Sequence, residues 1–149
     1  MNLAASPGSP ISELLTRPAL TIAATGSLGD AARAMRQANV SCALTDDGRI
    51  VTERDLTRGL AAGLGARDPV DEIAVPDPVA VVASLPVLHA AELMAARQIR
   101  HLVLTTDRGD PLGIVSIRDI VGVLILSAEP ALPAFLQQVV TEHSEIWLG

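Results

Sequence analysis

The chain has 149 residues, enough for one compact domain or two small fused units, and its 49% hydrophobic and 19% charged residues indicate a globular protein. All eleven basic residues are arginine, and the formal net charge of -6 argues against a nucleic-acid partner, because phosphate neutralisation requires a positive face. The single cysteine, Cys42, excludes an internal disulfide and a cysteine-rich zinc site, and no histidine lies at ligand spacing to another histidine or to the cysteine.

The predicted elements form two similar series, which follow a tail at residues 1–10. In chain order, the first series (residues 11–65) is expected to contain an extended stretch at 19–23, a helix at 28–37, a hairpin of strands 41–44 and 50–52, and a helix that ends near Gly63. The second series (residues 70–127) repeats this order with a stretch at 79–83, a helix at 87–97, a hairpin of strands 101–105 and 112–116, and a final helix. Gly48 and Gly109 mark the two hairpin turns.

The two series resemble each other in sequence as well as in order. Residues 31–35 resemble residues 90–94 at an offset of 59, and residues 50–56 resemble residues 114–120 at an offset of 64. We therefore predict an α+β fold of two β-α-β-β-α repeats packed as a pseudo-two-fold pair, with a C-terminal helix at 130–149.

The most informative motif is a hydroxyl followed three residues later by a carboxylate, where the last helix of each repeat begins: Thr52 and Asp55, then Ser116 and Asp119. A helix N-terminus favours an anion, a hydroxyl donates to phosphate, and Arg54 or Arg118 adds charged donors. A carboxylate repels phosphate but accepts two hydrogen bonds from a vicinal diol such as that of ribose. The combination suits a nucleotide.

The same pattern is also that of an ordinary capping box, which needs no ligand. A duplicated capping box would recur in both repeats just as a ligand site would, so the motif alone leaves both interpretations open. Arg100 and His101, at a strand start, are likewise either a surface pair or a phosphate contact.

Three segments carry a resemblance to a known family: residues 50–56 (IVTERDL), 99–103 (IRHLV) and 112–120 (LGIVSIRDI). The chain resembles a tandem pair of cystathionine-β-synthase-type (CBS) domains, a Bateman module, over about residues 11–126. The resemblance implies a stand-alone regulatory module rather than an enzyme. Such modules bind AMP, ATP, S-adenosylmethionine or another adenosyl ligand in the cleft between the two domains, with no required cofactor, and commonly form homodimers.

By this resemblance, Asp55 or Asp119 holds ribose, Thr52 or Ser116 faces phosphate, and the backbone of the first two strands frames adenine. The expected ligand-binding residues are Ser116, Arg118, Asp119, Thr52, Arg54, Asp55, Ile22, Val82, Ser41, Arg100 and His101. No catalytic or metal-binding residue is expected.

The sequence departs from the family pattern in two ways, and the first of them favours the second repeat. The first hairpin is about five residues shorter and lacks an equivalent of Gly113, and the usual proline of the second strand is absent from both repeats. We therefore favour the site built around Ser116, Arg118 and Asp119.

Residues 120–126 are apolar on every side of the predicted helix, which must be covered all round, and we expect a homodimer to supply that cover. An apolar stripe on the predicted helix at 130–149 is an alternative cover.

The apolar run at residues 120–126 is too short to cross a bilayer, and the first nine residues lack a signal-peptide pattern. We therefore expect a cytoplasmic protein with no membrane partner. The alternative function is a dimeric CBS-fold interaction protein that binds no nucleotide. Either function leaves room for a regulated protein partner. Nothing in the sequence resembles a hydrolase nucleophile motif.

Overall fold

The computed structural model describes residues 5–127, which form two compact units. The first-sheet unit comprises residues 19–78, and the second-sheet unit comprises residues 5–18 together with residues 79–127. The predicted helix at 130–149 lies outside the described residues. Within the described part of the chain, none of the helices combines the length and the apolar character needed to cross a membrane.

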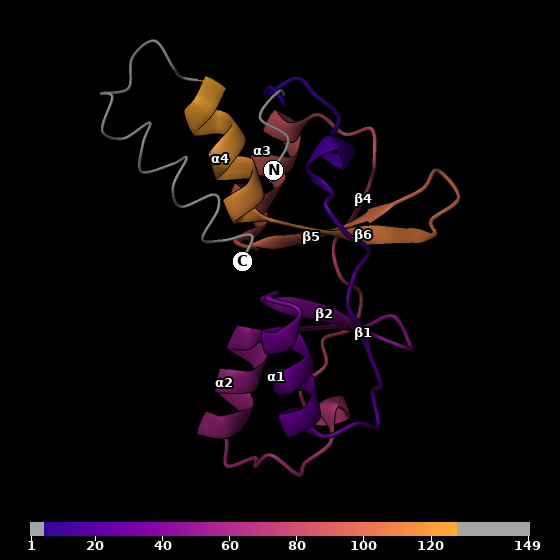
Figure 1. Ribbon diagram of the computed structural model, residues 1–149, viewed down its shortest axis with the longest axis vertical. Helices are drawn as coiled ribbons and strands as arrows, with labels where there is room; N and C mark the ends of the chain where they lie inside the picture. Colours follow the sequence, from indigo (N-terminus) through magenta and orange to yellow (C-terminus); the bar gives the residue numbers. More distant parts are fainter. Residues whose placement is uncertain (1–4, 128–149) are drawn as a thin grey trace. The chain divides into compact units, whose positions relative to one another are not determined.

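The first-sheet unit has one three-stranded sheet with both of its α-helices on the same face (Figure 1). Its elements are β1 (Thr21–Ile22), α1 (Leu28–Gln37), β2 (Cys42–Thr45), β3 (Ile50–Thr52), α2 (Glu53–Ala61) and the 3-10 helix η2 (Val70–Glu72). The strand order is β1-β2-β3, with β1 parallel and β3 antiparallel to β2. The core consists of Leu28, Ala31, Val51, Val70 and Ile73.

The second-sheet unit repeats this topology (Figure 1). Its elements are the 3-10 helix η1 (Ile11–Leu14), β4 (Ala80–Val82), α3 (Val87–Arg97), β5 (His101–Thr105), β6 (Pro111–Ser116) and α4 (Ile117–Ser127). The sheet order is β4-β5-β6, again with one parallel and one antiparallel pair. The predicted α+β fold with two β-α-β-β-α repeats is therefore confirmed.

Local sequence signals explain where the elements begin and end. The Ser27 hydroxyl accepts a hydrogen bond from the Asp30 amide and caps α1. Gly63 follows the last turn of α2 with φ 94°, and the turn glycines Gly48 and Gly109 have φ 86° and 87°, conformations that side chains disfavour. The expected extended stretches at 19–23 and 79–83 are shorter than predicted, because only the two residues of β1 and the three residues of β4 pair with the neighbouring strand.

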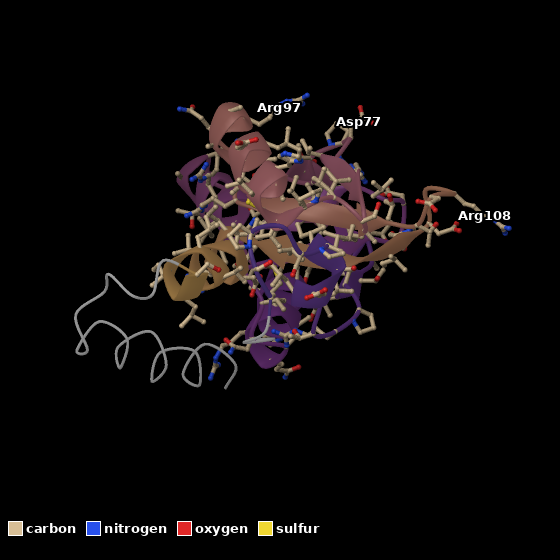
Figure 2. All side chains as sticks on the ribbon, turned by 90° about the horizontal axis from the view of Figure 1, so that it is seen from above. Asp77, Arg97 and Arg108 are labelled. Atoms are coloured by element: carbon tan, nitrogen blue, oxygen red, sulfur yellow. The ribbon has the colours of Figure 1, made fainter. Side chains whose placement is uncertain are left out.

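The two hairpins differ in length. β3 has three residues and β6 has six, so the second hairpin extends further beyond its helix–sheet core. Figure 2 shows Arg108 at the projecting tip of this hairpin. The difference matches the shortening of the first hairpin that the sequence indicates.

The short 3-10 helices are exchanged between the repeats. Ile11, from the start of the first repeat, is fully buried in the core of the second-sheet unit, and its amide donates to the Leu85 carbonyl at 2.8 Å. Val70, from the start of the second repeat, is buried in the first-sheet unit and its amide donates to the Gly26 carbonyl at 2.8 Å. The compact units therefore divide the chain differently from the sequence repeats. Part of the predicted tail also joins the second-sheet unit, where the Ser9 carbonyl accepts from the Val87 amide.

Candidate functional site

In both units the last strand runs directly into the last helix. β3 ends at Thr52 just before α2, and β6 ends at Ser116 just before α4. The first amide of each helix is already bonded, because Glu53 donates to the Ser41 carbonyl at 3.0 Å and Ile117 donates to the Arg100 carbonyl at 2.8 Å. The two strand–helix junctions therefore share one backbone arrangement.

At the first junction, Asp55 is engaged through both carboxylate oxygens. Its Oδ2 accepts from the Thr52 amide at 2.9 Å and from the Thr52 hydroxyl at 2.6 Å, and that hydroxyl accepts from the Asp55 amide at 3.3 Å. This is a complete capping box. The Arg58 guanidinium, one turn further along α2, donates to Oδ1. Asp55 is only 5% exposed.

At the second junction, Asp119 is engaged through one oxygen. Its Oδ2 accepts from the Ser116 amide at 2.8 Å and from the Ser116 hydroxyl at 2.7 Å. Gly122 follows three residues after Asp119, where α2 has Arg58 after Asp55. Among residues 5–127, no donor contacts Oδ1 of Asp119, which is half-buried, so this oxygen retains its capacity to accept hydrogen bonds.

The structure shows the complete capping box at the first junction and, at the second, the hydrogen bond from the Ser116 amide to the Asp119 carboxylate that forms half of such a box. The same chemistry occurs at the start of α1, outside the expected ligand site, where the Ser27 hydroxyl donates to Asp30 at 2.7 Å and Arg33 pairs with that carboxylate. Capping by itself therefore says nothing about a ligand. The second junction differs because Oδ1 of Asp119 takes no part in capping and accepts no hydrogen bond among residues 5–127.

The strand register shows which residues of the two hairpins are equivalent. His101 is opposite Ser116 in the β5–β6 pair, and Cys42 is opposite Thr52 in the β2–β3 pair. His101 thus corresponds to Cys42, and Ser41 corresponds to Arg100. Counting back from the strand–helix junction gives this alignment, because the junction fixes the register of the hairpin.

The other expected residues lie on the edge strands and the helix starts. Ile22 is opposite Thr45 in the β1–β2 pair, and Val82, opposite Thr105, is 42% exposed. Arg54 and Arg118 are both exposed on the first turn of their helices. The structure thus brings Thr52 with Asp55 and Ser116 with Asp119 into direct contact, and the ligand-binding roles of all these residues remain predictions.

Arg58 is the residue at these junctions that sequence reasoning missed. Its spacing of three from Asp55 on a predicted helix was the available signal, since residues three apart are neighbours on a helix surface. Within residues 5–127, no group of three or more His, Cys, Asp or Glu side chains is arranged to hold a metal ion.

Away from the junctions, an arginine network fixes the first hairpin turn. Arg49 donates to Asp47 at 2.9 Å through Nε and to Asp71 at 2.5 Å through Nη2, and the Thr45 hydroxyl also donates to Asp47. The hydrogen bonds from Arg49 and Thr45 lower the pKa of Asp47 from 3.8 to about 2, and the two carboxylates raise the pKa of Arg49.

Two β-α-β-β-α repeats, each ending in a carboxylate-capped strand–helix junction, define a tandem α+β repeat protein. The sequence profile of the CBS domain matches residues 11–62 and 70–126. These matches cover most of the chain, which therefore belongs to the CBS domain family and contains a tandem pair of CBS domains.

Similar proteins support the same assignment. A CBS domain protein from Pyrobaculum aerophilum, solved in complex with AMP, is 31% identical with a TM-score of 0.70, over 80% of this chain and 98% of its own. A CBS-domain-containing protein from Agrobacterium tumefaciens is 25% identical with a TM-score of 0.69, over 78% and 93% of the two chains. An uncharacterised 17.7 kDa protein of Acidianus ambivalens is 27% identical over 77% of this chain and 73% of its own length.

Proposed function

We propose that this chain is a regulatory module that binds an adenine nucleotide or a related adenosyl ligand, of the AMP, ATP or S-adenosylmethionine class. Binding would occur at the second strand–helix junction, with Asp119 as the acceptor for the ribose diol. The proposal includes no chemical reaction. The ligand would shift the module between states by as much as its affinity for those states differs.

The observation that carries the proposal is the remaining acceptor oxygen of Asp119. A carboxylate has about four acceptor sites, and Ser116 uses two of them at Oδ2. Oδ1 has no donor among residues 5–127. A vicinal diol presents two adjacent hydroxyl donors, and a hydrogen bond to a charged acceptor contributes about 1.5–3 kcal/mol.

A related structure supports the adenosyl class. The Pyrobaculum aerophilum protein, at 31% identity, was solved as a complex with AMP, and the alignment spans 98% of that chain. AMP is therefore the first ligand to test.

The deciding experiment compares AMP with 2′-deoxy-AMP, which lacks the diol, by titration calorimetry. The wild type is expected to bind AMP at least about tenfold more tightly than 2′-deoxy-AMP, since one charged hydrogen bond is lost. The Asp119→Asn variant, which keeps an acceptor for the Ser116 amide, should weaken AMP by about tenfold and abolish the preference for AMP.

Asp30→Asn is the matched control, because Asp30 plays the same capping part at the start of α1. It should leave AMP affinity unchanged. Unchanged AMP affinity in Asp119→Asn would remove the proposed role of this carboxylate, and failure of the wild type to bind AMP, ATP or S-adenosylmethionine would refute the function.

The second candidate function is a dimeric CBS-fold interaction protein that binds no nucleotide. The complete capping box at Thr52 and Asp55 and the short β3 favour it, because the first junction is satisfied without a ligand. Thermal unfolding separates the two candidates. A nucleotide present at a hundred times its Kd stabilises the folded state by about 2.7 kcal/mol, whereas a protein that binds none shows no shift.

A further inference from the structure

The two junction carboxylates differ in one neighbour. Asp55 has Arg58 three residues further along α2, and the Arg58 guanidinium donates to Asp55 Oδ1. Asp119 has Gly122 at that place in α4, and glycine has no side chain to donate. The capping contacts of the two carboxylates are otherwise alike, because each Oδ2 accepts from the amide and the hydroxyl of the residue three before it.

This single difference changes what each carboxylate can still accept. At Asp55 the capping hydroxyl and amide take both acceptor sites of Oδ2 and the guanidinium takes one of Oδ1, so about one site is left for the two donors of a diol. The Asp55 side chain is 7% exposed, whereas that of Arg58 is 65% exposed. The carboxylate is therefore nearly buried, while the side chain bonded to its Oδ1 is largely exposed to solvent.

We propose that Arg58 is an internal occupant of the first junction, which closes Asp55 to ribose-containing ligands and leaves Asp119 as the one diol-binding carboxylate. This inference rests on the proposed function and deepens it, because one arginine would then set the number of ligand molecules that each chain binds. A diol that engages Asp55 must first displace a charged hydrogen bond, whereas a diol that engages Asp119 displaces no protein side chain among residues 5–127.

The test counts AMP molecules bound per chain by titration calorimetry and native mass spectrometry. The wild type is expected to bind one AMP. Arg58→Met keeps the length of the side chain and the helix propensity but removes the donors and the charge, and should bind a second AMP. Because an exposed ion pair contributes up to about 1 kcal/mol, the affinity of the first junction for AMP should rise by up to about fivefold in this variant.

A second set of variants isolates the first junction. In the Asp119→Asn background, which should have lost most AMP binding, Arg58→Met is expected to restore one AMP per chain. Arg58→Lys keeps a cation beside Asp55 and should restore none. Arg33→Met is the matched control, because Arg33 pairs at the same spacing with Asp30 of the first turn of α1, and it should also restore none.

The outcomes separate the inference from the function on which it rests. If the wild type binds one AMP through Asp119 and Arg58→Met still binds only one, the inference is overturned and the proposed function stands. Two AMP molecules on the wild type would also overturn the inference alone. If neither the wild type nor Arg58→Met binds AMP, ATP or S-adenosylmethionine, both are overturned. Circular dichroism melting of each variant confirms that loss of binding is not loss of folding.

Discussion

Asp47 lies in the turn of the first hairpin, where Arg49 and Thr45 both donate hydrogen bonds to its carboxylate. These donors bind the charged form, and they lower the pKa of Asp47 from 3.8 to about 2. A carboxyl group whose pKa is depressed in the folded state stabilises that state above its unfolded pKa. The contribution is lost as the pH falls through the folded pKa.

Asp47→Asn is therefore expected to unfold at a lower temperature than the wild type at pH 6. This difference in unfolding temperature should become smaller as the pH falls from about 4 towards 2. Asp107→Asn is the control, because Asp107 is an exposed turn residue of the second hairpin and its side chain has no hydrogen bond among residues 5–127. This variant should unfold at the same temperature as the wild type at both pH values. Thermal melts across this pH range check the prediction. A gap between Asp47→Asn and the wild type that persists unchanged at pH 2 would contradict it.

The junction carboxylates show how one residue type acquires different capacities from its neighbours. Asp55 and Asp119 both cap a helix, yet only Asp55 has an arginine one turn later. The proposed ligand site thus depends on a glycine, Gly122, as much as on the acid itself.

At the scale of elements, the segment that follows η1 is held against β6 through a glycine. A Cβ at Gly113 would lie 2.7 Å and 2.9 Å from the two methyl groups of Leu15, and 3.1 Å from the Arg17 carbonyl oxygen. Such distances are too short for carbon contacts without movement of the backbone or of Leu15. Gly113 therefore permits the exchanged η1 segment to pass close to the second sheet.

Gly113→Ala is expected to lower the free energy of unfolding by about 1–3 kcal/mol, the usual effect of overpacking. Gly8→Ala is the control, because a Cβ there would meet nothing within 4 Å, and it should change stability by less than about 0.5 kcal/mol. Urea unfolding of both variants measures the difference. Equal stability of the two variants would show that Leu15 moves aside freely.

At the scale of the whole molecule, the apolar face of α4 bears on the expected homodimer. Ile120 and Val123 are buried within the second-sheet unit, whereas Val121 is 42% exposed on the same helix. The described residues therefore leave one large apolar side chain of α4, that of Val121, exposed. We expect a second copy of the chain to cover the remaining side.

Val121→Glu should convert a dimer into a monomer, because burying an unpaired carboxylate at an interface is unfavourable. Leu112→Glu, with an exposure of 39% on β6 rather than on a helix, should leave the mass unchanged. Light scattering coupled to gel filtration gives the masses. A monomeric wild type would refute the expected dimer.

Much of the fold could be predicted from local patterns. The spacing of Leu28, Ala31 and Met35 predicted α1, and Gly48 and Gly63 predicted a turn and a helix end at their positive φ angles. The internal repeat predicted the two equal topologies, because similar sequences fold into similar units.

What the sequence by itself determined was the identity of the elements, their order and the recurrence of the hydroxyl–carboxylate motif, since these depend on residues close together in the chain. Only the tertiary structure decided that Ile11 is buried with the second sheet and Val70 with the first, because repeat similarity shows which segments are equivalent but not which copy each one contacts. It also decided that Arg58 engages Asp55, while the second junction retains an acceptor at Asp119. Hydrogen-bond occupancy is a property of atoms in space, and a motif read along the chain does not contain it.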